Sequence, residues 1–282
     1  MLTVNSIAAV RQQIQAWRRQ EQSVAFVPTM GSLHAGHLAL VEQARQQADK
    51  AVVSIFVNPT QFGPNEDFEC YPRTLDEDSA KLETVFADML FAPSVEEIYP
   101  GGYGEATYVD VPHITEILEG EQRPGHFAGV ATVVAKLFNI VQPDKVLFGE
   151  KDYQQLQVIH QMVADLCIPI EVISVPTKRE SDGLAMSSRN AYLSQAERAI
   201  APKLYQALKQ ATDALAQGVG DYTKLEQAGI AALKRGGFEP EYFVIRQAKT
   251  LQSPRDDDTA LVVLAAAKLG TTRLIDNLSL SR

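Results

Sequence analysis

Cysteine and long apolar stretches are both scarce in this 282-residue sequence. Its two cysteines, Cys70 and Cys167, lack the spacing of a metal site or a redox pair, which indicates a reducing compartment, so we expect a cytoplasmic protein. The longest strongly apolar stretch, residues 260–267, is far shorter than the about 20 residues that span a bilayer, so we expect no membrane partner. We also expect no secretory signal, because the apolar patch at residues 7–10 is short and is followed by Arg11.

Basic residues are the minority among the charged ones. The chain has 26 lysines and arginines against 35 aspartates and glutamates, which gives a formal net charge of −9 at pH 7. Because a dedicated nucleic-acid binder contacts phosphates through a basic surface, this balance argues against a nucleic-acid partner. It leaves open a small anionic ligand in a locally basic pocket.

The first part of the chain alternates short apolar runs with longer segments of helical periodicity. Runs that are apolar throughout are typical of parallel strands covered on both faces, and the intervening helices indicate a doubly wound α/β domain. We assign this domain to residues 1–176. The predicted strands are residues 24–27, 51–57, 88–92, 145–148 and 170–175, and the predicted helices are residues 7–17, 38–48, 76–86, 129–141 and 153–166.

The pattern changes after residue 176, where helices come first and strands follow. This order indicates a smaller α+β domain, which we assign to residues 177–282. The predicted helices are residues 194–217 and 221–235, and the predicted strands are residues 242–245, 261–264 and 272–275.

Polar residues gather at places where a ligand is expected. In an open parallel sheet, ligands bind beyond the carboxyl ends of the strands. Five segments lie at such ends or in long loops, and together they could supply one crevice. They are residues 28–37, 58–61, 119–129, 149–155 and 182–190.

Residues 27–38, VPTMGSLHAGHL, join a predicted strand to a predicted helix. Gly31 and Gly36 permit close backbone approach to a ligand, and the N–H groups at a helix start favour an anion. His34 and His37 can donate hydrogen bonds to a phosphate from one side of that helix. The alternatives are a solvated helix start or part of a zinc site, but zinc needs three or four ligands and no third is evident, so we expect no metal ligands.

Cationic and hydroxyl side chains occur in two further segments. Lys151, directly after a predicted strand, could neutralise a polyphosphate, or it could belong to a solvated charge cluster with Glu150 and Asp152. The SSR triplet at residues 187–189 offers two hydroxyl donors and a forked guanidinium, which suit terminal phosphate oxygens. Such a triplet is common, so taken alone it is weak support for a phosphate site.

Three amide side chains lie near apolar neighbours in the same segments. Asn58, Gln61 and Gln155 can both donate and accept hydrogen bonds, so they suit a ligand with hydroxyl groups and a carboxylate. As isolated residues they are also typical of ordinary loops and helix surfaces. Their occurrence with the phosphate-binding candidates at successive strand ends favours the functional interpretation.

Several of these motifs resemble those of a known family. VPTMGSLHAGH resembles the HIGH-type signature of the nucleotidyltransferase superfamily, which includes class I aminoacyl-tRNA synthetases, and MSSRN resembles their second signature. With FVNPTQF, YPRT, RPGHFAGV, FGEKDYQQL and DGLAMSSRNAYL in this order, the chain is similar to the pantoate–β-alanine ligases from about residue 24 to the closing TTRLIDN. The resemblance implies a Rossmann-like sheet of the nucleotidyltransferase type, with the smaller C-terminal domain closing over the active site.

The resemblance also implies a reaction and a set of site residues. These ligases use ATP with Mg²⁺ to condense (R)-pantoate with β-alanine through a pantoyl-adenylate, forming pantothenate, AMP and pyrophosphate for coenzyme A synthesis, usually as homodimers. The implied catalytic residues are His37 as the acid, His34 beside it, Lys151, Ser187, Ser188 and Arg189. The implied ATP-binding residues are Met30, Gly31, Ser32, Leu33, His34, Ala35, Gly36, His37, Gly149, Glu150, Lys151, Asp152, Lys178, Met186, Ser187, Ser188 and Arg189. The implied pantoate-binding residues are Gln61, Gln155 and Asn58, and Gln61 is also implied to bind β-alanine.

Three positions depart from the family pattern. Thr60 stands where methionine is frequent, and Ala128 stands where arginine is frequent, which removes a cation from that loop. Lys178 replaces an often apolar residue that meets adenine through its backbone, and a backbone contact survives such a change.

Two other functions stay open at this point. Another nucleotidyltransferase, such as a cytidylyltransferase, shares the HIGH-type signature but keeps the nucleotide on its product; the paired glutamines and the GEKD and DGLAMSSR motifs argue against it. A non-enzymatic nucleotide-binding module would tolerate loss of His34 or Lys151, yet every reactive position implied by the resemblance is filled.

Overall fold

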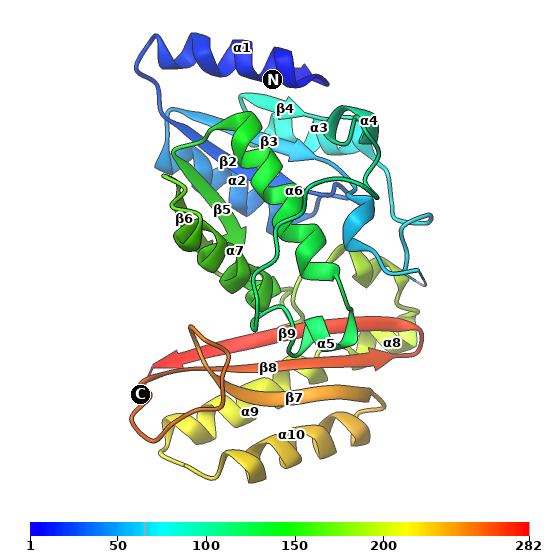
Figure 1. The fold of residues 1–282 in the computed structure, drawn as a ribbon. Coiled ribbons are helices and arrows are strands. Elements are labelled where there is room, and N and C mark those ends of the chain that lie inside the picture. The colour runs from blue at the N-terminus through cyan, green and yellow to red at the C-terminus, as the bar shows by residue number, and fades with distance from the viewer. Residues whose placement is uncertain (65, 282) are drawn as a thin grey trace. The chain divides into compact units, whose positions relative to one another are not determined.

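The computed structural model describes residues 1–64 and 66–281, and within them the first of two units is built on a sheet of six parallel strands (Figure 1). This unit comprises Met1–Gly149 and Gln154–Val175, and the second comprises Glu150–Tyr153 and the chain from Pro176 onward. The strands of the first unit are β1 (Leu2–Val4), β2 (Val24–Thr29), β3 (Lys50–Ile55), β4 (Met89–Phe91), β5 (Lys145–Gly149) and β6 (Glu171–Val175).

The strand order of this sheet is β1-β4-β3-β2-β5-β6. From β2 the chain builds outward through β3 and β4, and it then returns to the other side of β2 to form β5 and β6. This order confirms the predicted Rossmann-like, doubly wound α/β class. The direction of building reverses between β2 and β5, and ligands of such sheets bind beyond the carboxyl ends of the strands at this reversal.

Helices cover the sheet on both faces, with α6 in front of it and α2 behind it in Figure 1. Alternate residues of β2 explain this arrangement, because Ala25 and Val27 pack with Leu40 of α2 and Leu82 of α3, whereas Phe26, also fully buried, has the opposite orientation. The helices of this part of the chain are α1 (Ile7–Arg18), α2 (Ala35–Gln47), η1 (Pro59–Gln61), α3 (Leu75–Thr84), α4 (Val95–Ile98), α5 (Glu119–Gln122), α6 (His126–Val141), η2 (Glu150–Asp152) and α7 (Tyr153–Asp165).

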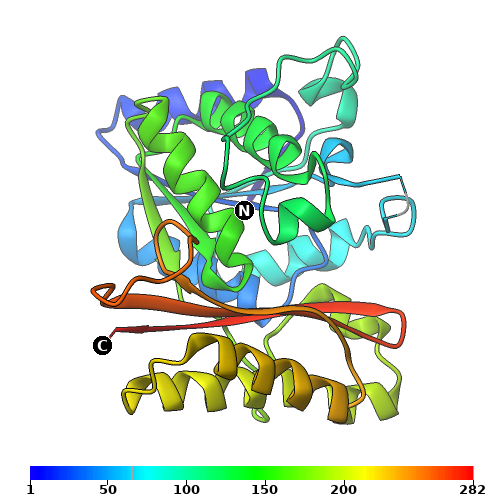
Figure 2. The ribbon, with the colours of Figure 1, turned by 60° about the horizontal axis from the view of Figure 1, so that its bottom comes forward.

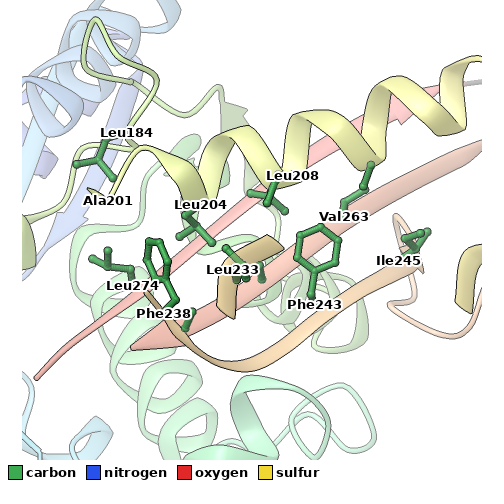
Figure 3. Close-up of a cluster of buried hydrophobic side chains, with 14 of the residues drawn as sticks. Leu184, Ala201, Leu204, Leu208, Leu233, Phe238, Phe243, Ile245, Val263 and Leu274 are labelled. Atoms are coloured by element: carbon green, nitrogen blue, oxygen red, sulfur yellow. The ribbon is translucent and has the colours of Figure 1, made fainter. Parts of the chain in front are cut away.

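The described part of the second unit contains a three-stranded antiparallel sheet, in the order β7-β8-β9. Helices α9 and α10 lie side by side on one face of this sheet (Figures 1 and 2). Figure 3 shows the core that they form, in which Leu204 and Leu208 of α9 and Leu233 of α10 lie with Phe243 of β7 and Val263 of β8. The elements are η3 (Ser188–Tyr192), α8 (Gln195–Ile200), α9 (Lys203–Ala216), α10 (Tyr222–Arg235), β7 (Glu239–Gln247), β8 (Ala260–Leu269) and β9 (Thr272–Ser281).

One predicted helix of the second unit is wrong as a continuous element. Residues 194–217 form two helices, because α8 ends at Ile200 and α9 begins at Lys203. Pro202 lies between them and lacks the backbone N–H that a continuous helix needs at this point, so the chain breaks there. The predicted strands of this unit are all present and are longer than expected.

Candidate active site

The turn at residues 30–34 connects β2 to α2 with a backbone that most residues adopt rarely. Gly31 has a φ of +85°, and Ser32 follows with a φ of +51°. His34 then takes an extended conformation as the N-cap, and the helix begins at Ala35, three residues earlier than the apolar pattern predicts. The start of α2, which is the positive end of its dipole, therefore lies at the carboxyl end of β2.

A fully buried carboxylate, that of Asp78 in α3, holds this turn. Its two oxygens accept hydrogen bonds from the backbone N–H groups of Ser32 and Leu33, both at 2.8 Å, and from the hydroxyl of Thr74 at 3.1 Å. Lys81 donates to the carbonyl of Leu33 at 2.9 Å, and its Nζ lies 3.6 Å from Asp78. This network offsets the left-handed backbone of the turn, since strained conformations persist where surrounding contacts over-determine them.

Both histidines of the turn use Nδ1 as an acceptor. The Nδ1 atom of His34 accepts from the N–H of Gly36 at 3.1 Å, and the Nδ1 atom of His37 accepts from the N–H of His34 at 3.3 Å. A ring nitrogen that accepts carries no hydrogen, so each neutral ring has its proton on Nε2. The ring centroids lie 4.1 Å apart. The helix cap therefore turns two neighbouring imidazoles into Nε2–H donors.

The amides of Asn58 and Gln61 lie together at η1. The buried Asn58 donates to Oε1 of Gln61 and to the carbonyl of Gly129, both at 3.1 Å, and its oxygen accepts from the Tyr99 hydroxyl at 2.9 Å. Burial raises the pKa of Tyr99, so its hydroxyl keeps its proton and remains a donor. Nε2 of Gln61 donates to the sulfur of Met30 at 3.2 Å. Because a thioether is a weak acceptor, a substrate oxygen would be a stronger partner for this amide.

Gly129 allows α6 to approach η1 closely. A Cβ atom at this position would lie 2.3 Å from the carbonyl oxygen of Thr60 and 2.8 Å from the backbone nitrogen of Gln61. Distances this short are not found for real side chains, so the contact requires glycine. Thr60 also donates to Oδ1 of Asn58 at 3.1 Å, so in this chain it takes part in the amide network.

The two neighbouring glutamines of α7 have different surroundings. Gln154 is buried and anchors the segment before α5, because it accepts from the N–H of Glu119 at 3.0 Å and donates to the carbonyls of Ile114 and Ile117. Gln155, the predicted pantoate ligand, is half-buried. Gln154 therefore orders the segment before α5.

In the second unit, Lys151 lies in η2, just after β5. Its side chain is 19% exposed, and its Nζ lies 3.7 Å from Oδ1 of Asp152. The side-chain amide of Asn277 in β9 donates to the carbonyls of Glu150 and Lys151 at 2.8 and 2.9 Å. Strand β9 thus fixes the backbone that carries Lys151.

A buried ion pair orders the start of the loop that leads to the SSR triplet. Arg179 makes two hydrogen bonds to Asp276, at 2.7 and 3.0 Å, and donates to the carbonyl of Gly183 at 3.1 Å. Its guanidinium lies over the ring of Tyr205, 4.3 Å from the centroid. Burial raises the pKa of Asp276, and the two hydrogen bonds from Arg179 act in the opposite direction.

The end of this loop carries the predicted phosphate ligands. The N–H of Met186 donates to the carbonyl of Lys178 at 3.0 Å, and the hydroxyl of Ser187 caps η3 by accepting from the N–H of Arg189 at 3.3 Å. Strand β9 contacts both η2 and η3. Within the second unit, β9 therefore connects the segment of Lys151 with the SSR triplet, while His34, His37, Asn58, Gln61 and Gln155 belong to the first unit.

Sequence reasoning missed the residues that support these segments. No motif marks these residues, which are Asp78, Gln154, Arg179 and Asp276. Two signals could have found some of them: Asp78 interrupts the apolar periodicity of a helix, and Arg179 belongs to a lysine-arginine pair before a glycine turn.

Among the described residues, no group of three or more histidine, cysteine, aspartate or glutamate side chains could hold a metal ion. In the same part of the chain no helix is long and apolar enough to cross a membrane.

Comparison with known proteins decides between the functions that the sequence left open. Residues 2–279 match the family described as pantoate-beta-alanine ligase. The chain belongs to this family. Pantothenate synthetases of Shewanella amazonensis and Alcanivorax borkumensis are 55% and 53% identical to it, with 100% of this chain and 100% and 98% of theirs covered. The resemblance inferred from the sequence is therefore confirmed.

Solved structures of the family have the same fold. The pantothenate synthetase of Thermus thermophilus is 49% identical, with a TM-score of 0.92 and 99% of both chains covered. The pantoate-beta-alanine ligase of Francisella tularensis, solved in complex with Beta-gamma ATP and β-alanine, is 36% identical, with a TM-score of 0.79 and 99% and 97% of the two chains covered.

Proposed function

We propose that this protein catalyses the ATP-dependent condensation of (R)-pantoate with β-alanine, through a pantoyl-adenylate, to pantothenate, AMP and pyrophosphate. This is the step that forms pantothenate for coenzyme A synthesis. The observation that carries the proposal is the match to pantothenate synthetases over the whole chain at more than half identity. The ligase of Francisella tularensis, whose complex holds a form of ATP and β-alanine, supports it.

In the first step, a carboxylate oxygen of pantoate attacks the α-phosphorus of ATP, and pyrophosphate leaves. Both reactants are anions, so catalysis consists mainly of offsetting charge and aligning them. We propose that the Nε2–H groups of His34 and His37 donate to the phosphates, with His37 as the acid toward the leaving group. Lys151 and Arg189 supply fixed positive charge, and Ser187 and Ser188 supply hydroxyl donors.

The remaining proposed ATP ligands are backbone-rich segments: the turn at residues 30–37, the residues Gly149 to Asp152, the backbone of Lys178, and Met186. We propose that ATP enters as its magnesium complex, in which the ion lies on phosphate oxygens and keeps several waters. The supporting feature in the first unit is the turn held by Asp78, which presents the start of α2 to an anion.

We propose that Gln61 and Gln155 bind pantoate, since an amide can serve both the hydroxyls and the carboxylate of this acid. Gln61 also lies near β-alanine in this proposal. Asn58 contributes indirectly, because its own amide is engaged with Gln61, Gly129 and Tyr99 and so holds Gln61 in place.

In the second step, the amine of β-alanine attacks the acyl carbonyl of the adenylate, the amide bond forms, and AMP leaves. The acyl-adenylate must be shielded from water until the amine arrives. We further propose a cytoplasmic homodimer, as the family resemblance implies.

The function is tested by incubating the protein with ATP, Mg²⁺, pantoate and β-alanine and measuring AMP and pantothenate with each acid omitted in turn. We expect both products only when both acids are present. In the absence of β-alanine, pantoate alone should support exchange of labelled pyrophosphate into ATP. A product that retains the nucleotide, or ATP that stays intact with both acids present, would contradict the proposal.

A further inference from the structure

Three side chains of the first unit form a hydrogen-bonded chain that ends on the backbone of Gln61. Glu66 accepts from Nε and Nη2 of Arg123 at 2.6 and 2.5 Å. Nη1 of Arg123 lies 3.0 Å from Nε2 of His126, and Nδ1 of His126 lies 2.8 Å from the carbonyl oxygen of Gln61. The residues come from the segment after η1, from the end of α5 and from the first residue of α6.

The partners of His126 determine where its proton lies. Because a guanidinium donates but never accepts, Nε2 of His126 must accept from Arg123 and carries no hydrogen. The hydrogen then lies on Nδ1, which donates it to the carbonyl of Gln61. Burial and the neighbouring Arg123 charge lower the pKa of His126 from 6.5 to about 4, so the ring stays neutral at neutral pH. His126 is thus the opposite tautomer of His34 and His37.

Glu66 keeps Arg123 in position for this contact. Burial raises the pKa of the Glu66 carboxyl, but the hydrogen bonds and charge of Arg123 outweigh it, so the pKa lies below its usual value. In the segment that carries Glu66, the ring of Phe62 packs against the rings of Phe68 and Tyr71, with distances of 5.4 and 5.8 Å between ring centroids. A charged, two-point contact of this kind has a defined geometry, so Arg123 directs Nη1 toward His126 at 3.0 Å and Nη2 toward the carbonyl of Gln61 at 3.4 Å.

Gln61 is therefore held at two points. His126 donates to its backbone carbonyl, which Nη2 of Arg123 also approaches at 3.4 Å, and Asn58 donates to its side-chain oxygen. The group left to meet a ligand is the Nε2 amide, which now faces the sulfur of Met30. A substrate contact made by this amide depends on the backbone beneath it, because a displacement of about 1 Å is enough to weaken catalysis.

We propose that Glu66, Arg123 and His126 are positioning residues for substrate binding, with His126 held as the neutral Nδ1–H tautomer so that it fixes the backbone of Gln61. The chain sets the affinity for the hydroxy acid that Gln61 binds, and this part of the inference rests on the proposed function. The tautomer itself does not depend on any substrate.

Three variants of His126 separate positioning from mere packing. The side-chain amide nitrogen of asparagine lies as many bonds from Cα as Nδ1 of histidine does, so His126→Asn can keep the donor to Gln61. The amide nitrogen of glutamine lies as many bonds from Cα as Nε2 of histidine, so His126→Gln misplaces the donor. His126→Leu has no donor. We expect the pantoate KM to rise roughly tenfold in His126→Gln and His126→Leu, because a buried hydrogen bond is lost, and to change less than about twofold in His126→Asn. The ATP KM should stay near that of the wild type. Equal effects in all three variants, or an equal rise of both KM values, would overturn the positioning role.

A second measurement tests the same inference without any reaction. The ¹⁵N chemical shifts of the His126 ring in the ligand-free protein should show a protonated Nδ1 and an unprotonated Nε2 from about pH 5.5 to 8. In Arg123→Met, which removes the donor to Nε2 and the neighbouring positive charge, the carbonyl of Gln61 still accepts from Nδ1, so the proton should stay on Nδ1 and the pKa of the ring should rise above about 4. A wild-type ring with its proton on Nε2 would refute the inference even if the enzyme makes pantothenate. Conversely, the expected tautomer in a protein that makes no pantothenate would refute only the proposed function.

Discussion

Replacing Gly129 by alanine adds one methyl group at the contact between α6 and η1. In most helices this change is favourable by about 1 kcal/mol, because alanine has the higher helix propensity. Here the new Cβ would lie 2.3 Å from the carbonyl oxygen and 2.6 Å from the carbonyl carbon of Thr60, whereas ordinary contacts begin at 3.4 Å. Either α6 or η1 must therefore move by about 1 Å, and the atoms in the way are backbone atoms that cannot rotate aside.

Two effects of Gly129→Ala follow from this displacement. Forced overpacking costs about 1–3 kcal/mol, so the free energy of unfolding should fall despite the better helix propensity. Because η1 carries Gln61, a shift of about 1 Å should lower kcat/KM for pantoate by roughly 100-fold.

Urea unfolding and steady-state kinetics with pantoate as the varied substrate measure the two effects. Gly101→Ala is the matched control, since a Cβ at Gly101 meets nothing within 4 Å, and it should leave both quantities near those of the wild type. If Gly129→Ala matched the wild type in stability and in kcat/KM for pantoate, the close approach of α6 to η1 would not support the site as argued.

Two further predictions concern buried titratable groups. In Asp78→Asn, one of the two backbone N–H groups of the turn loses its carboxylate acceptor. The unfolding free energy should therefore fall by about 1–3 kcal/mol, and the ATP KM should rise more than the pantoate KM. The control is Asp76→Asn, at an exposed position of the same helix, which should produce neither effect. In the folded protein His126 lies near Arg123, Glu66 and Glu119, and its pKa is about 4, below the ordinary value of 6.5. Between pH 4 and pH 6.5 the unfolded chain therefore binds a proton at this residue that the folded chain does not. The unfolding free energy of the wild type should therefore fall by up to about 3 kcal/mol relative to His126→Asn as the pH is lowered from 6.5 to 4, and parallel pH curves for the two proteins would contradict this.

The apolar strands made the fold predictable from the sequence. Runs such as residues 51–57 are typical of strands in a sheet covered on both faces, and their alternation with helical segments predicted the doubly wound class. Strand β1 has three residues and two of them are exposed, so it carries no such signal. Pro202 was visible in the sequence, but the apolar periodicity on either side of it favoured one helix, and the break shows that the missing N–H decides.

The candidate site was predictable where one motif carries its own chemistry. The histidines and glycines of residues 31–37 predicted an anion-binding helix start, and the structure adds that the cap sets the tautomer of both rings. Supporting residues could not be found in this way, because their partners are remote in sequence. Asp78 lies more than 40 positions from the turn it holds, and Asp276 lies 97 positions from Arg179.

The central claim is that the turn at residues 30–37 donates hydrogen bonds to ATP while pantoate is activated, and His37→Asn tests it most directly. Asparagine can still accept from the N–H of His34, so the cap is kept and the Nε2–H donor is removed. Pantoate-dependent exchange of labelled pyrophosphate into ATP should fall by about 10²–10³-fold, while the same substitution at the exposed His113 should leave exchange near that of the wild type. Exchange that persists at the wild-type rate in His37→Asn would contradict the account.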